Sequence, residues 1–179
     1  MIDTFQNLSI DLTSLPEVTQ SEFNQIERKY LRVSLISRSI LFFLMLVAAI
    51  LIVSLSDEIE KGLFEFGVSS GPILLLWSFS IFYAIKAFPK KKYSLREKDI
   101  IYSKGLLWQT RTAIPFNRIQ HAEVKQGPIE RIFKLHSLKV YTAGGESSDL
   151  VIPGLSEENA GKIKEFIMGK TALDGVDQH

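Results

Sequence analysis

The stretch from Leu35 to Leu55 reads LISRSILFFLMLVAAILIVSL and contains one charged side chain, that of Arg38. A helix of about 21 residues rises roughly 30 Å, which matches the hydrocarbon thickness of a bilayer. A buried helix of a soluble protein would show a polar face, and Ile40 to Leu55 has almost none. The largely polar residues that precede the stretch do not fit a cleaved signal peptide. We therefore predict a transmembrane helix over residues 35–55.

A second apolar stretch, VSSGPILLLWSFSIFYAIKAF, runs from Val68 to Phe88 and is of similar length. Gly71 and Pro72 lie near its beginning, where residues that break helices do the least harm. Tyr83 lies nearer its end, where interfacial aromatic side chains are common. The two stretches predict a membrane α-helical hairpin over residues 35–88, with a short external loop between the helices.

Charged residues around the hairpin predict its orientation, because positive side chains favour the cytoplasmic side of a membrane. Basic residues flank the outer ends of both helices: Arg28, Lys29, Arg32, Arg38, Lys86, Lys90, Lys91 and Lys92. The short connection is mostly acidic and contains Asp57, Glu58, Glu60, Lys61 and Glu65. We expect a multi-pass membrane protein with both termini in the cytoplasm.

The segment before the hairpin, residues 1–34, is ordinary soluble sequence by comparison. Phe23, Ile26, Tyr30 and Val33 recur in it at helical spacing, with charges between them. We predict a cytoplasmic N-terminal segment with a short amphipathic helix that leads into the first span. This helix would lie on the membrane or pack on the soluble part of the chain.

After the hairpin the pattern changes to short strands. Strands are predicted in KKYSLRE, FNRIQHAEVKQ, SLKVYTA and SDLVIPG. The stretch DIIYSKGLLWQTRTAIP reads as two strands around Lys104-Gly105, because glycine accepts a positive φ without penalty. Pro153-Gly154 is expected to end the last strand. The order of these stretches favours an antiparallel sheet.

The stretch SEENAGKIKEFIMGK, near the end of the sequence, predicts an amphipathic helix. Ser156 can cap its N-terminus, and Gly169 suits its C-terminal end. Its apolar stripe consists of Ala160, Ile163, Phe166 and Ile167. A curved sheet closed by this helix would bury the stripe. We predict a cytoplasmic domain of the α+β class, mainly β, over residues 89–170, followed by a mobile tail at 171–179.

The run from Arg118 to Gly145, RIQHAEVKQGPIERIFKLHSLKVYTAGG, gathers histidines, arginines and glutamates in a short distance. The parity of its apolar residues switches between Phe116 and Ala122, which predicts a β-bulge that bends the strand. His121 and Glu123 then project from the face opposite Ala122. The charged cluster is thus explained by the way a small sheet folds.

A turn and a single helical turn are predicted in the middle of the same run. Gly127 and Pro128 turn the chain, and Ile129 to Phe133 form the helical turn. Ile132 and Phe133 are expected to pack against the sheet. Glu130 and Arg131 are expected to be solvated or paired with neighbours.

No reaction centre is predicted. A metal site needs three or four converging ligands, and the histidines, His121, His136 and His179, lack such a spacing. Ser137 beside His136 is too little for a hydrolytic triad. The chain has no cysteine and a formal net charge of +1, which excludes thiol chemistry and argues against nucleic-acid binding. We predict a non-enzymatic protein with no catalytic residue, metal or cofactor.

The run IPFNRIQHAEVKQGPIERIFKLHSLKVYTAGG, with VIPGL after it, resembles the second bacterial pleckstrin-homology-like (PH-like) family, of the YdbS type. The resemblance covers Lys92 to about Met168 and rests on RIQHAE, QGPIER and TAGG in the expected order. Lys134 stands where the family pattern has a glycine. The resemblance implies a bacterial cytoplasmic (inner) membrane protein whose two packed antiparallel sheets, seven strands in all, are capped by the C-terminal helix. It also implies a partner, a larger membrane protein with repeated PH-like domains.

Two functions remain open from the sequence. The first is a membrane-anchored PH-like interaction or scaffolding module that docks a membrane protein partner, or itself, through sheet edges or the loop around Gly144. The alternative is recognition of anionic lipid headgroups by a basic juxtamembrane surface. The residues that would face the lipid are Lys90, Lys91, Lys92, Lys104, Arg111 and Arg118.

Overall fold

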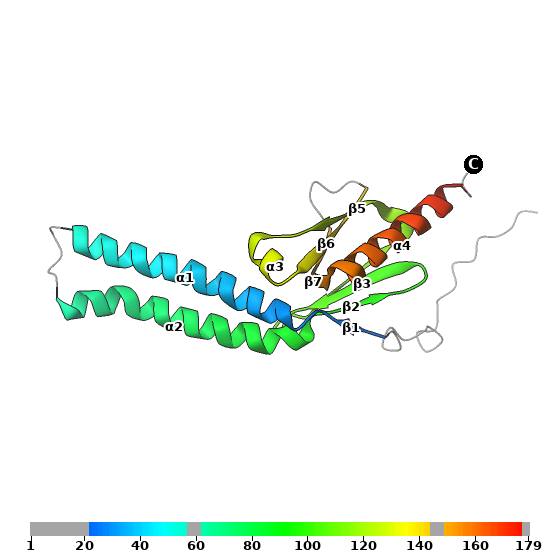
Figure 1. Ribbon diagram of the computed structural model, residues 1–179. Helices are drawn as coiled ribbons and strands as arrows, with labels where there is room; N and C mark the ends of the chain where they lie inside the picture. Colours follow the sequence, from blue (N-terminus) through cyan, green and yellow to red (C-terminus); the bar gives the residue numbers. More distant parts are fainter. Residues whose placement is uncertain (1–21, 57–61, 144–148, 177–179) are drawn as a thin grey trace, which may run out of the picture.

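The computed structural model of the chain describes residues 22–56, 62–143 and 149–176. It consists of a long helical hairpin with a mainly β domain at one end (Figure 1). The predicted external loop and the predicted docking loop around Gly144 fall at residues 57–61 and 144–148, outside the described residues.

The hairpin is formed by α1 (Lys29–Leu55) and α2 (Leu63–Ala87), which lie side by side (Figure 1). Both helices are long and apolar enough to cross a membrane. Most of their large apolar side chains are exposed, as expected when lipid rather than protein covers them. The second helix begins at Leu63 rather than Val68, so Pro72 lies inside α2 and not near its beginning.

The segment before α1 differs from its sequence-based prediction. Residues Asn24–Gln25 form strand β1, which pairs with β2 (Lys92–Leu95), and helical structure begins only at Lys29. The amphipathic helix predicted from the spacing of Phe23 to Val33 is therefore wrong over its first part. The free edge of β2 offers hydrogen bonds to this segment, and Ile26 is buried in the core beside it. Long-range pairing thus overrides the local period.

Two antiparallel sheets build the domain, which confirms the predicted fold class. The first sheet has the order β1-β2-β3-β4, with β3 at Asp99–Lys104 and β4 at Thr110–Pro115. The second has the order β5-β6-β7, at Ile119–Lys125, Leu135–Thr142 and Leu150–Ser156. Short helical turns connect the parts: η3 (Phe88–Lys90), η4 (Phe116–Arg118) and α3 (Pro128–Ile132).

Helix α4 (Glu157–Val176) closes the two sheets (Figure 1). The Asn159 backbone N–H donates to Ser156 Oγ at 3.2 Å, which is the predicted N-terminal cap. Ala160, Ile163 and Ile167 are buried, with Phe116, Ile100, Leu138, Val140 and Ile152 among the core residues around them. The helix continues to Val176, so residues 171–176, predicted as a mobile tail, belong to it.

Several predicted details of the strands are confirmed. The pairing of β5 with β6 shifts register between Ile119 and His121, which is the predicted bulge. Gly105 has a φ of 102°, as the β3–β4 turn requires. Lys134 has a φ of 54°, so the position where the family pattern has glycine does adopt a left-handed backbone. Ile132 differs from its prediction, because its side chain is exposed rather than packed.

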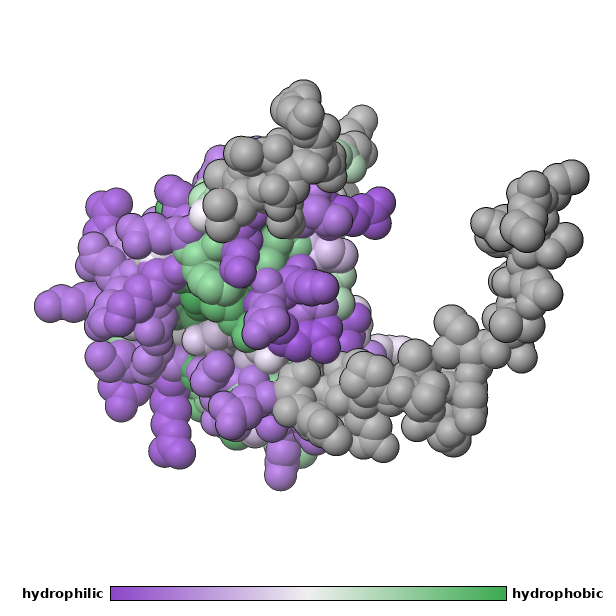
Figure 2. Space-filling model, turned by 90° about the vertical axis from the view of Figure 1, so that its right-hand side faces the viewer, coloured by the Kyte–Doolittle hydropathy of each residue, from purple (hydrophilic) through white to green (hydrophobic). Residues whose placement is uncertain are grey.

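The hairpin is joined to the second sheet as well as to the first. Strand β7 continues through Pro153-Gly154 to Ser156, past its predicted end. The Glu27 backbone N–H donates to the Gly154 carbonyl oxygen at 2.8 Å. The two sheets thus hold the chain just before α1. Figure 2 shows the opposite end of the domain, where hydrophilic side chains surround a central apolar area.

Candidate functional site

Two lysines meet at the end of the first sheet that lies next to the hairpin. Strands β2 and β3 pair with Lys92 opposite Ser103, so Lys91, just before β2, lies opposite Lys104 at the end of β3. Lys104 is in turn paired with Thr110 of β4. Because side chains alternate between the faces of a strand, Lys91 and Lys104 share one face of the sheet.

A cavity of about 230 Å³ lies where this end of the sheet meets both helices. We call it the junction cavity. Three positively charged side chains line it: Arg38 from α1, Lys91 and Lys104. Its other lining residues include Tyr30, Ser34, Tyr83, Ala84, Ala87, Trp108 and Thr110. The cavity is therefore basic on one side and apolar or aromatic on the other.

Arg38 is held in place by hydroxyl groups. Its Nη1 donates to Ser80 Oγ of α2 at 2.7 Å, and its Nε lies 3.4 Å from Ser34 Oγ of its own helix. A guanidinium has five N–H donors, so these two bonds leave donors free. Arg38 is thus oriented by neutral partners and keeps its charge available to an anion.

The environment of Lys91 is the most unfavourable for a cation. Burial lowers the pKa of Lys91, and the positive charges of Arg38 and Lys104 lower it further. Its Nζ lies 4.9 Å from the centre of the Tyr30 ring, which offsets part of this cost. Among the described residues, no carboxylate forms an ion pair with any of the three cations. An anion in the junction cavity would supply the missing charge.

The remaining residues of the predicted lipid-facing set lie elsewhere. Lys92 and Arg111 flank Ser103 in the sheet register, so they share the face opposite Lys91. Lys90 is exposed in η3. Arg118 precedes β5, whose other end leads to α3 beside the hairpin, so it lies one strand length, roughly 20 Å, away.

The sequence-based set did not include Arg38. From the sequence, Arg38 was interpreted only as one of the basic residues that orient the first span. The signal that would have identified it is its position inside an apolar span, where a charged side chain is a functional candidate by default.

The charged cluster of the second sheet forms contacts within the domain. The His121 ring stacks on Tyr141 at 4.2 Å, and Lys125 Nζ lies 2.8 Å from a carboxylate oxygen of Glu123. The hydrogen bond from Lys125 lowers the pKa of the Glu123 carboxyl. The carboxylate of Glu130 accepts from the Gly127 N–H at 2.8 Å and from Ser137 Oγ at 2.7 Å, which fixes the start of α3.

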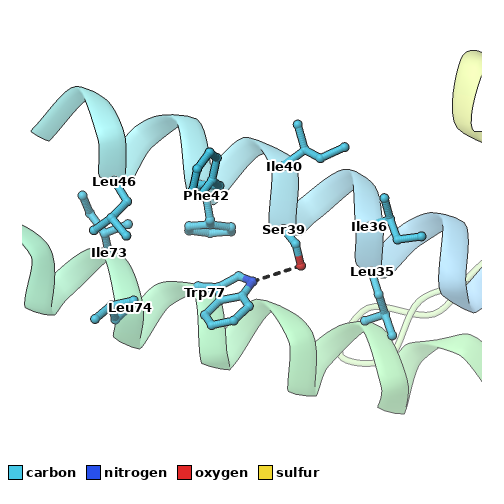
Figure 3. Close-up of a pocket in the computed structure, with 10 residues that line it drawn as sticks. Leu35, Ile36, Ser39, Ile40, Phe42, Leu46, Ile73, Leu74 and Trp77 are labelled. Carbon is cyan, nitrogen blue, oxygen red and sulfur yellow. Dashed lines mark hydrogen bonds between the residues drawn. The ribbon is translucent and has the colours of Figure 1, made fainter. Parts of the chain in front are cut away.

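A second feature of the hairpin is an apolar groove between α1 and α2, with a volume of about 510 Å³ (Figure 3). Phe42 and Leu46 of α1 and Ile73 and Leu74 of α2 line it. Trp77 Nε1 donates to Ser39 Oγ at 3.4 Å across the groove (Figure 3). The groove lies between the two helices that are long and apolar enough to cross a membrane.

Comparison with known sequences defines the class of this membrane protein. The family described as Bacterial PH domain matches residues 10–171, which include the hairpin as well as the two sheets. The chain belongs to this family.

The chain is also similar to two individual transmembrane proteins. The chain is 29% identical over 103 residues to the UPF0699 transmembrane protein YdbS of Bacillus subtilis (strain 168), covering 55% of this chain and 63% of that protein. It is 28% identical over 108 residues to the UPF0699 transmembrane protein YdbT of the same strain, covering 60% of this chain and 22% of YdbT. The chain thus spans less than two thirds of each relative.

A solved structure is also similar, a duf1696 family protein with a pleckstrin-homology domain from Shewanella loihica PV-4. The match has a TM-score of 0.37 and 18% identity, and it covers 47% of this chain and 73% of that one.

Proposed function

We propose that this protein is a membrane-anchored PH-like module that binds anionic phospholipid headgroups of the cytoplasmic leaflet in its junction cavity. Both termini and the PH-like domain then lie on the cytoplasmic side, because the basic residues flank the domain end of the hairpin. The cavity lies at the end of α2, where the headgroups of that leaflet would be. Binding, rather than catalysis, is the proposed role.

The observation that carries this proposal is the convergence of Arg38, Lys91 and Lys104 without a carboxylate partner among the described residues. Arg38 and Lys91 are partly buried, whereas Lys104 is exposed at the rim of the cavity. Partly buried cations are costly unless an anion neutralises them. A guanidinium and two ammonium groups also match the donors that a phosphate accepts. Each basic residue near an anionic surface contributes about 1 kcal/mol, so three together favour an anionic lipid roughly 100-fold over a neutral one.

The test compares two variants that remove the same charge. The first variant removes the three cations of the cavity by the substitutions Arg38→Gln, Lys91→Gln and Lys104→Gln. In the second, Lys92→Gln, Arg111→Gln and Arg118→Gln remove three cations from other surfaces.

The full-length proteins would be equilibrated with phosphatidylglycerol and phosphatidylcholine in detergent, and the bound lipid counted by native mass spectrometry. We expect the preference for phosphatidylglycerol to be lost in the first variant and kept in the second. An equal loss in both variants would show that net charge, and not the cavity, selects the lipid.

A second function, docking of another membrane protein or of a second copy, is favoured by the apolar groove between α1 and α2. Helices associate in membranes through close packing, and a groove lined by Phe42, Leu46 and Ile73 provides a surface for a third helix. The similarity to part of the much longer YdbT fits the implied larger partner with related domains.

Photocrosslinking tests this second function. A photoreactive residue in place of Phe42, in native membranes, would join the chain to a defined protein or to itself. Products that contain only lipid would exclude docking at the groove.

A further inference from the structure

Three large apolar side chains of the domain are prominently exposed. Leu107, Trp108 and Ile132 are 68%, 82% and 77% exposed. Among the described residues after the hairpin, the other exposed large apolar side chains, Val151 and Phe166, are 37% and 39% exposed. A single exposed apolar side chain needs no explanation, so the position of these three decides whether they matter.

Leu107 and Trp108 form the tip of the turn between β3 and β4. This turn lies at the hairpin end of the sheet, because Trp108 lines the junction cavity together with Tyr83 and Ala84 of α2. Tyr83 is five residues before Phe88, the end of the predicted span, and five helical residues rise about 7 Å. Trp108 therefore lies level with the last turns of the predicted span.

Gly105 determines the shape of this turn. Its φ of 102° favours glycine, and a Cβ there would lie 1.9 Å from the carbonyl oxygen of Trp108. The backbone therefore closes tightly on itself at this turn, whose tip carries the exposed side chains of Leu107 and Trp108.

Ile132 ends α3, which also lies against α1. A second cavity, of about 410 Å³, is lined by Gly127 to Glu130 and by Val33, Ser37 and Arg38 of α1. Ile132 follows Ile129 by three residues, so the two side chains share a face of the helix. Arg38 lines this cavity and the junction cavity, so the start of α3 and Trp108 both lie near the same turn of α1. Figure 1 shows α3 beyond α1 as seen from α2.

We propose that Leu107, Trp108 and Ile132 insert into the boundary between headgroups and acyl chains of the bilayer that holds the hairpin. The domain then rests on the membrane at two apolar points, the β3–β4 turn and the end of α3, instead of moving freely on its connection. Tryptophan favours this boundary, and inserted apolar residues reach roughly 5–10 Å below the headgroups. Exposed basic residues adjoin both points, Lys104 at one and Arg131 and Lys134 at the other, and can contact the headgroups.

This insertion does not depend on the proposed anion site, because it rests on apolar surface and not on charge. It is therefore tested in nanodiscs of phosphatidylcholine alone, a neutral lipid. Both faces of a nanodisc are open to soluble reagents, so the orientation of the protein does not affect the result.

The first experiment uses tryptophan fluorescence of the full-length chain. The sequence has two tryptophans, so Trp77→Phe leaves Trp108 as the reporter. We expect phosphatidylcholine with brominated acyl chains to quench Trp108 strongly and aqueous iodide to quench it weakly. A matched control carries Glu97→Trp in a chain with Trp77→Phe and Trp108→Phe. This reporter lies in the exposed β2–β3 turn at the far end of the sheet, where iodide alone should quench it.

The second experiment uses the absence of cysteine from the sequence. Single variants Trp108→Cys, Ile132→Cys and Glu97→Cys would be labelled with a membrane-impermeant maleimide in the same nanodiscs. We expect labelling at positions 108 and 132 to be at least several-fold slower than at position 97. Equal labelling at all three positions, or full iodide quenching of Trp108 without quenching by brominated lipid, would overturn the proposal and leave the anion site untouched.

Discussion

Tyr30, in the first turn of α1, packs directly on the backbone of Gly154 in β7. A Cβ added to Gly154 would lie 2.6 Å from Tyr30 Cβ and 2.7 Å from its Cγ, and the glycine has a φ of 69°. The adjacent hydrogen bond from the Glu27 N–H to the Gly154 carbonyl oxygen measures 2.8 Å. The start of the hairpin is thereby seated on the second sheet, which sets the position of Arg38, two turns further along α1.

Gly154→Ala should therefore destabilise the junction. A left-handed alanine costs about 1–2 kcal/mol, and overpacking against Tyr30 costs about 1–3 kcal/mol more. We expect the Tm of the full-length protein in detergent to fall by at least several degrees, at roughly 2–4 °C per kcal/mol for a chain of this size. Gly161→Ala is the control, because no atom lies within 4 Å of the added Cβ in α4, and it should be neutral or stabilising.

Lys134→Gly should stabilise the protein. Lys134 holds a φ of 54° after α3, and its backbone N–H donates to the Arg131 carbonyl oxygen at 3.1 Å. Relief of the left-handed strain outweighs the added chain entropy of glycine by up to about 1 kcal/mol. The same change at Lys139, inside β6, should lower the Tm instead. A decrease in Tm for Lys134→Gly would contradict the strained backbone.

Lys91→Met should stabilise the protein in neutral lipid and remove its response to anionic lipid. The lowered pKa of Lys91 means that the unfolded chain binds its proton more tightly, so the penalty is full at neutral pH and is lost as the pH rises through the lowered pKa towards 10.5. Methionine carries no charge, so the Tm of Lys91→Met should exceed the wild-type Tm most near pH 7. This difference in Tm should shrink by pH 9.5. Thermal unfolding in phosphatidylcholine nanodiscs at the two pH values measures this. A Tm of Lys91→Met below that of the wild type at pH 7 would contradict the predicted cost of the Lys91 charge.

Ile167→Ala should be among the most damaging changes in α4. Ile167 is fully buried in the hydrophobic core, and truncation of such a side chain costs about 2–5 kcal/mol. Phe166→Leu, one position earlier, should cost less, because Phe166 is partly exposed and makes one edge-to-face contact with Phe116 at 5.8 Å. Comparable losses of Tm in the two variants would contradict the assignment of Ile167 to the core-facing side of α4.

Much of the fold could be predicted because its signals are local. The apolar stretches at 35–55 and 68–88 need no knowledge of other segments to be recognised as membrane helices. The parity switch near Ile119 predicted the bulge, because a strand alternates by residue. Ser156 predicted the start of α4, since a cap bonds only to its own helix.

The errors arose where distant segments compete with local preference. Phe23 and Ile26 have helical spacing, but β1 pairs with the edge of β2, which lies far along the chain. Ile132 was predicted to pack on the sheet, whereas its exposure at the hairpin end fits a membrane contact outside the protein. Neither the pairing of β1 with β2 nor the exposure of Ile132 can be predicted from the neighbouring residues in the sequence alone.

By itself, the sequence determined that the chain has two helices long and apolar enough to cross a membrane and that a small mainly β domain follows them, because hydrophobic length and periodicity act within one segment. Only the tertiary structure decided which cations meet. The register of β2 against β3 turns Lys91 and Lys104 to one face and Lys92 and Arg111 to the other. The packing of Tyr30 on Gly154 then positions α1 so that Arg38 lines the junction cavity with Lys91 and Lys104. Such convergence depends on contacts between segments far apart in the chain, which no local pattern specifies.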